Sequence, residues 1–218
     1  MKYGSVIFDL DGVILDSMES EEWKYRAARD ALSELGVNDD LDREVLKAVL
    51  GIRGYEECVR ICGDIGVDPR KAWNLVAEKT TEARMREIQQ NDFGLVDGSR
   101  EVLSELREEQ LKLGVISNAP DQAVEAVVDH FDLRNYFKFF RGVQSFEDLK
   151  ARKPHPNHLE LAKFQLKRDP YLYIGDHESD VEAATNAQMD SVWVHPGNHE
   201  EPTYTVDSLD GLLDVVSD

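Results

Sequence analysis

Short apolar runs alternate with longer stretches of helical periodicity along much of the chain. The strand-like runs lie at residues 5–8, 111–116, 137–143, 171–174 and 191–194, and helical patterns lie between them at 99–109, 121–130, 156–165 and 179–187. Strands that alternate with helices in this way are typical of a parallel sheet with helices on both faces. We therefore predict an α/β fold built on a doubly wound parallel sheet.

Residues 17–95, between the first and second strand-like runs, show helical patterns throughout. The clearest start signal in this segment is Asp68-Pro69, a capping acid followed by proline at the first helical position. We predict four helices here, over 17–35, over 42–50, from Tyr55 to Ile65, and from Asp68 along a stripe of Trp73, Ala77, Thr80 and Arg84. The segment is thus expected to be a helical domain, joined at 15–17 and 91–98 to a core of residues 1–16 and 96–218.

Polar side chains that could take part in catalysis or ligand binding follow three of the predicted strands. Asp9-Leu10-Asp11-Gly12 comes after the first, Ser117-Asn118 after the second, and Asp176 with Asp180 after the strand at 171–174. A lysine within a proline-rich turn, Arg152-Lys153-Pro154-His155-Pro156, lies between the last two segments. Ligands of open α/β sheets bind beyond the carboxyl ends of the strands, and acids this close need a cation or a shared proton. These segments are therefore the candidate site.

In order and spacing, these four segments resemble the signature motifs of the haloacid dehalogenase superfamily of phosphohydrolases, and the resemblance covers nearly the whole chain. It implies a Rossmann-like core, with residues 17–95 as a helical cap of the type found in the phosphoglycolate phosphatase and β-phosphoglucomutase branch. Haloacid dehalogenases lack the second acid of the first motif, which is Asp11 here. Phosphate ester chemistry is therefore the expected activity.

The resemblance also implies roles for the acids and for Mg²⁺, whose preference for oxygen ligands suits carboxylates and a phosphate. Asp9 would be the nucleophile and a metal ligand. Asp11 would offer its backbone carbonyl to the metal and its carboxyl group as general acid and then general base. Asp176 would complete the protein ligands. Asp180 would orient a metal-bound water or the lysine, although an acid favoured by the helix dipole is an alternative reading.

Three further residues are predicted to bind the phosphoryl group. Ser117 and Asn118 would hold its oxygens, and Lys153 would neutralise charge shared with Asp9. The alternative for Ser117-Asn118 is a helix cap or turn, and a lone lysine is usually solvated. In the predicted cap, Arg53 within Gly51-Ile52-Arg53-Gly54 suits an anionic substrate group, and an exposed arginine in an ordinary turn is an equally good reading.

We thus predict a Mg²⁺-dependent phosphatase of small organic phosphate monoesters that acts through phospho-Asp9 and resembles phosphoglycolate phosphatase. One alternative is a β-phosphoglucomutase-like phosphosugar mutase, although the Gly-x-Ser-Arg segment usual in that branch is Gly51-Ile52-Arg53-Gly54 here. A second alternative is a non-catalytic phosphate-sensing or interaction protein on the same fold. The intact Asp9, Asp11, Lys153 and Asp176 argue against it.

The composition limits the classes of partner that we expect the protein to bind. The formal charge of −19 repels nucleic acid and anionic membranes, so we expect neither as a partner. No apolar stretch is long enough to span a bilayer and no signal-peptide pattern is present, so a cytoplasmic protein, monomeric or homodimeric, is expected. The acidity fits either a high-salt cytoplasm or an ordinary acidic enzyme. Cys58 and Cys62 are expected to be packing residues, and His177 part of the pocket wall.

Overall fold

The computed structural model describes residues 1–17, 20–37, 41–194 and 201–217. Six parallel strands form one sheet in the order β5-β4-β1-β6-β7-β8. Their bounds are β1 Ser5–Phe8, β4 Lys112–Pro120, β5 Phe137–Val143, β6 Tyr171–Gly175, β7 Asp190–Val194 and β8 Tyr204–Val206. The predicted doubly wound α/β fold is confirmed. The short β8 was not expected, because three residues show no readable periodicity.

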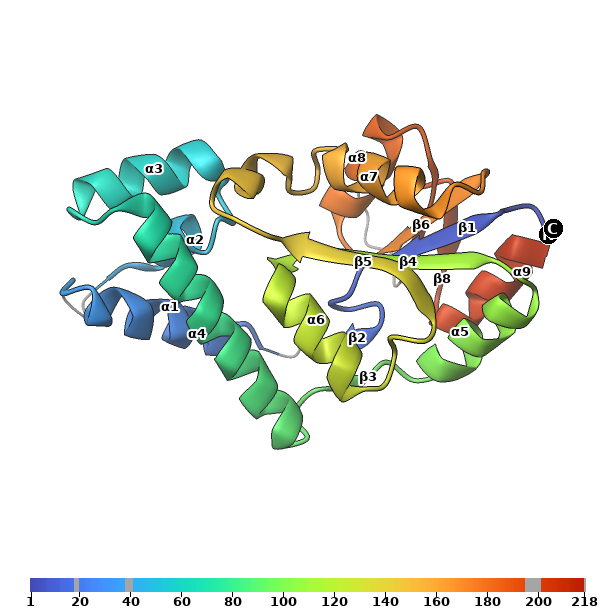
Figure 1. Ribbon diagram of the computed structural model, residues 1–218, viewed down its shortest axis with the longest axis horizontal. Helices are drawn as coiled ribbons and strands as arrows, with labels where there is room; N and C mark the ends of the chain where they lie inside the picture. The colour runs from blue at the N-terminus through green and yellow to red at the C-terminus, as the bar shows by residue number, and fades with distance from the viewer. Residues whose placement is uncertain (18–19, 38–40, 195–200, 218) are drawn as a thin grey trace.

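Helices cover both faces of the sheet (Figure 1). One face packs against α5 (Ser99–Glu108), α6 (Asp121–His130) and α9 (Leu212–Ser217), and the other against α7 (Asn157–Leu166) and α8 (Glu178–Asn186). Strand β1 is buried on both sides: Val6 and Phe8 face the first layer and Ile7 faces the second. This double burial explains why β1 is a continuous apolar run.

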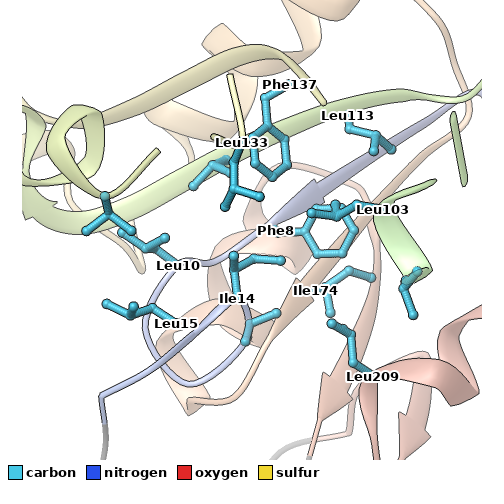
Figure 2. Close-up of a cluster of buried hydrophobic side chains, with 14 of the residues drawn as sticks. Phe8, Leu10, Ile14, Leu15, Leu103, Leu113, Leu133, Phe137, Ile174 and Leu209 are labelled. Carbon is cyan, nitrogen blue, oxygen red and sulfur yellow. The ribbon is translucent and has the colours of Figure 1, made fainter. Parts of the chain in front are cut away.

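The first layer forms the larger core cluster. Figure 2 shows Phe8, Leu113 and Ile174 of three adjacent strands packed with Leu103 of α5 and Leu209. Leu10 and Ile14, in the loop after β1, are fully buried in the same cluster. The loop that carries the two candidate catalytic acids is therefore anchored by apolar side chains on either side of Asp11.

Four helices lie between β2 (Leu15–Asp16) and β3 (Gly94–Leu95) in the described residues: α1 (Glu22–Glu34), α2 (Arg43–Val49), α3 (Tyr55–Asp64) and α4 (Pro69–Gln89). Helix α4 begins as expected, with the Asp68 side chain accepting a hydrogen bond from the Lys71 amide at 2.9 Å and proline at the first position. Helix α1 begins at Glu22 and not at 17, and residues 18–19 lie outside the described part of the chain. These helices, hereafter the cap, have their own core, in which the Cys58 and Cys62 thiols are buried and free.

Two chain segments connect the cap to the sheet. They pair as an antiparallel two-stranded sheet, β2 (Leu15–Asp16) with β3 (Gly94–Leu95), inside the segments predicted as hinges. The domain bounds of 17–95 for the cap and 1–16 with 96–218 for the core stay a prediction. No helix within the described residues combines the length and apolar character that crossing a bilayer requires.

Candidate active site

The carboxyl ends of β1, β4 and β6 meet at the centre of the sheet, next to the cap. From β1 the chain proceeds outward through β4 and β5 to one edge, and from β6 through β7 and β8 to the other. This reversal beside β1 is the place where open α/β sheets bind ligands. A cavity of about 610 Å³ lies there, lined by Asp9, Ser117 and Asp176 from the sheet and by Thr80 and Arg84 from α4.

Asp9 and Lys153 form a buried ion pair on the cavity wall. The Nζ of Lys153 lies 2.8 Å from Oδ1 of Asp9, and the side chain of Lys153 is only 2% exposed. Burial raises the pKa of Asp9 well above its ordinary value; Lys153 opposes this shift, while Asp180, Asp176 and Asp11 add to it. Burial also lowers the pKa of Lys153, but Asp180 and Asp9 outweigh burial and leave it raised. Lys153 is therefore a fixed cation beside the predicted nucleophile.

Asp180 and Tyr173 fix the position of Lys153. Oδ1 of Asp180 accepts a hydrogen bond from Lys153 Nζ at 2.5 Å, and Lys153 also donates to the Tyr173 hydroxyl at 2.8 Å. Oδ2 of Asp180 accepts from the backbone amides of His177 at 3.1 Å and Asp176 at 3.3 Å, which caps α8. The two sequence-based readings of Asp180 are thus compatible, because one carboxylate both orients the lysine and caps the helix.

Three carboxylates could hold a metal ion. Asp9, Asp176 and Asp180 each offer an oxygen, and these oxygens lie within 4.8 Å of one another. The pKa of Asp176 is raised to about 7, first by burial and then by the charge of Asp180. Carboxylates that repel one another in this way, with one ammonium group among them, fit a hard divalent cation such as Mg²⁺.

Gly12 allows the loop after β1 to approach Asp176. Its φ is +75°, and a Cβ at this position would lie 1.9 Å from Oδ2 of Asp176. Any other residue would therefore displace this carboxylate or the loop. The Asp-Gly step of the first motif is thus explained by close packing between the loop and the third motif.

The carboxylate of Asp11 points to the cap. It accepts hydrogen bonds from both terminal nitrogens of Arg84, one of them at 3.1 Å, and from the Ser17 hydroxyl at 2.6 Å. Burial opposes ionisation of Asp11, but Arg84 and Ser17 outweigh burial, and the pKa of Asp11 is lowered. The side chain of Asp11 is therefore separate from the three clustered carboxylates, which leaves only its backbone carbonyl for a metal.

Arg84 is a site residue that the sequence analysis did not assign to the site. Its side chain is 7% exposed, and its guanidinium group lies 5.2 Å from the ring centroid of Trp23. The sequence does contain a signal for this role, because Arg84 is the charged member of an otherwise uncharged stripe along α4. A charged residue on a buried helix face needs a partner. The sequence could not identify this partner, which lies 73 positions away.

Ser117 and Asn118 lie on the cavity wall, as expected of the second motif. The Asn118 side chain, however, forms two hydrogen bonds with the backbone of Lys153: it accepts from the amide at 2.9 Å and donates to the carbonyl at 3.1 Å. The Ser117 hydroxyl accepts from the Ala119 amide at 3.1 Å. In this structure Asn118 positions the lysine loop, and phosphoryl binding by either residue stays a prediction.

Arg53 and His177 lie elsewhere on the cavity wall. The half-exposed Arg53 is held by Glu44 of α2, to which Nε donates at 3.0 Å and Nη2 at 2.6 Å. His177 caps α8 and accepts at Nδ1 from the Ser179 amide at 3.1 Å. The pocket-wall position expected for His177 is confirmed. Substrate binding by Arg53 stays a prediction.

Known proteins are similar to this chain in both sequence and fold. Residues 6–194 match the family model described as "Haloacid dehalogenase-like hydrolase". Phosphoglycolate phosphatase of Photorhabdus laumondii is 26% identical, with 98% of this chain and 89% of that protein covered. Hexitol phosphatase B of Escherichia coli is 31% identical, with 93% and 88% covered. The structure of CbbY from Rhodobacter sphaeroides in complex with phosphate superposes with a TM-score of 0.71 at 23% identity, covering 96% of each chain.

Proposed function

This chain belongs to the haloacid dehalogenase-like hydrolases, and we propose that it is a Mg²⁺-dependent phosphatase of small organic phosphate monoesters, such as phosphoglycolate. The observation that carries the proposal is the buried Asp9 beside Lys153 at the end of β1, on the wall of a cavity that the cap also lines. The names of the related phosphatases support the same substrate class.

In the first half-reaction, a carboxylate oxygen of Asp9 attacks phosphorus and the bond to the leaving oxygen breaks. Lys153 lies 2.8 Å from Asp9 and neutralises part of the negative charge that gathers there. When bound, Mg²⁺ would be held by Asp9, Asp176 and the Asp11 backbone carbonyl, and it would act as a Lewis acid for the phosphate. Both oxygens of Asp180, the third carboxylate of the cluster, already accept hydrogen bonds from Lys153 and from backbone amides. Asp11 supplies the proton to the leaving oxygen.

In the second half-reaction, Asp11 accepts a proton from water, which attacks phosphorus and releases Asp9. Both oxygens of Asp11 accept hydrogen bonds from Arg84 in this structure, so this arrangement corresponds to the proton-accepting form. Proton donation requires Asp11 to separate from Arg84 and to carry a proton, which it accepts from water in the second half-reaction of the preceding turnover. Because Arg84 lies on the cap, a change in the position of the cap relative to the sheet would accomplish this.

We expect activity to disappear with a chelator and to return with Mg²⁺. The change Asp176→Asn is expected to weaken Mg²⁺ binding by roughly 10- to 100-fold, the range for perturbed metal sites. Hydrolysis of a panel of phosphate esters, titrated with Mg²⁺, would measure both effects, and release of free phosphate without isomerised ester would exclude the mutase alternative. Full activity in excess chelator would contradict the proposal.

The same metal site predicts a pH dependence of stability. Asp176 has an ordinary pKa of 3.8 and a pKa of about 7 in the metal-free fold, so the folded protein binds more protons than the unfolded chain between these values. The stability of the metal-free protein should therefore fall as the pH rises through this window. Because Mg²⁺ binds the ionised form, it should raise the melting temperature more at pH 8 than at pH 6. Equal increases at both pH values in thermal unfolding would contradict this expectation.

A further inference from the structure

Five cationic side chains line the cavity, and four of them form ion pairs with acids of the chain. The pairs are Lys24 with Glu21, Arg53 with Glu44, Arg84 with Asp11, and Lys153 with both Asp9 and Asp180. The fifth cation is Arg152, which has no acidic partner among residues 1–17, 20–37, 41–194 and 201–217. Among the described residues, Arg152 is therefore the cation of this cavity that has no counter-charge.

The surroundings of Arg152 make this lack of a counter-charge costly. Its Nη1 donates to the backbone carbonyl of Leu50 at 3.3 Å, and its buried Nε has no hydrogen-bond partner among the described residues. Burial alone lowers the pKa of Arg152 to about 10, so the side chain still carries its charge at neutral pH. A guanidinium group that lines a cavity without a counter-charge is stabilised by an anion that enters the cavity.

The position of Arg152 separates it from the phosphoryl end of the cavity. Its neighbour Lys153 reaches Asp9, whereas Arg152 reaches the cap at Leu50 and Gly51. A Cβ on Gly51, whose φ is +72°, would lie only 2.8 Å from Nη1 of Arg152. The glycine of the cap turn thus makes room for the guanidinium group. Two consecutive residues place one cation at the nucleophile and another at the cap side of the same cavity.

We propose that Arg152 binds a second anionic group of the substrate and so selects small phosphate esters that carry a carboxylate or a second phosphate. The inference rests on the proposed phosphatase function and adds to it the residue that recognises the rest of the substrate. The planar guanidinium group can offer two parallel N–H donors to a carboxylate or phosphate. Arg53, the residue expected from the sequence, already donates through Nε and Nη2 to one carboxylate oxygen of Glu44.

A matched pair of substrates tests the proposal. In 2-hydroxyethyl phosphate, a hydroxymethyl group replaces the carboxylate of 2-phosphoglycolate. For Arg152→Met, we expect kcat/KM for phosphoglycolate to fall by roughly 10- to 100-fold, the value of one charge-assisted contact. The loss should appear mainly in KM, and hydrolysis of 2-hydroxyethyl phosphate should change less than about threefold. Arg152→Lys, which keeps the charge but not the paired donors, should fall between wild type and Arg152→Met.

Arg100→Met is the matched control. Arg100 is exposed on α5 and donates to the Phe131 carbonyl at 2.5 Å, with no acid as partner in the described chain, and it lies outside the cavity. This variant should hydrolyse both substrates as the wild type does. Thermal unfolding of each variant checks that the fold is intact. If Arg152→Met does not fold, Arg152→Lys and the preference of the wild type for phosphoglycolate still test the proposal.

Three results would overturn the inference. The first is an equal loss of activity on both substrates in a folded Arg152 variant, and the second is a wild type with no preference between them. The third is a loss specific to phosphoglycolate in Arg53→Ala but not in Arg152→Met, which would assign recognition to the cap turn. Failure of the wild type to hydrolyse any phosphate ester would instead contradict the proposed function itself.

Discussion

Asp9→Asn is expected to abolish the phosphoenzyme with every substrate, whereas Asp11→Asn should abolish it only with substrates that have a poor leaving group. Asp9 supplies the attacking oxygen, so its loss stops the first half-reaction. An alkyl phosphate needs protonation of its leaving oxygen, and Asp11 is the proposed donor. An aryl phosphate with an acidic phenol needs no such help and should still phosphorylate Asp9 in Asp11→Asn.

The second half-reaction should then stall in Asp11→Asn, because no base activates the water. General acid–base groups typically contribute 10²- to 10⁴-fold, so turnover of the aryl phosphate should fall by about this factor. Acid-quenched Asp11→Asn protein, incubated with aryl phosphate, should carry phosphate on Asp9 in mass spectrometry. Absence of phospho-Asp9 in this variant, while the wild type hydrolyses the same substrate, would show that the assigned roles are wrong.

Lys153→Met is expected to cost both stability and activity. Its removal leaves Asp9 and Asp180, both buried, without the ammonium group that lies 2.8 Å and 2.5 Å from their oxygens. Breaking a buried ion pair by removing one partner typically costs about 3–5 kcal/mol in the free energy of unfolding. Urea unfolding in the presence of chelator measures this loss. The same substitution at the exposed Lys138 is the control and should cost less than about 0.5 kcal/mol.

The double variant Lys153→Met with Asp180→Asn separates the two roles of the lysine. Removing the charge of Asp180 relieves one uncompensated buried acid, so part of the lost stability should return. Activity should not return, because Asp9 still lacks the neighbouring cation that offsets the charge of the phosphoryl group. A Lys153→Met protein as stable as Lys138→Met, or a double variant that recovers full activity, would contradict this account.

Residues close together in the sequence determined which segments form strands and which polar groups stand at the strand ends. The run Val6-Ile7-Phe8 is apolar throughout because β1 is buried on both faces, and the same property marks β4 and β6. Since parallel strands end at one edge of the sheet, the polar residues after them were expected to meet there. Asp9 and Asp176 do meet, and Lys153 joins them. Start signals such as Asp68-Pro69 were equally local.

Only the tertiary structure decided which charges lie opposite one another. Arg84 meets Asp11 because α4 packs across the cavity from the loop after β1, an orientation that no local pattern encodes. The sequence likewise indicated only that Arg53 and Arg152 each lie in a turn. Packing then paired Arg53 with Glu44 and left Arg152 beside Gly51 without an acid in the described chain. Strand formation and helix capping depend on neighbours a few residues away, whereas the free energy of a buried charge depends on groups that only the folded chain brings within a few ångströms.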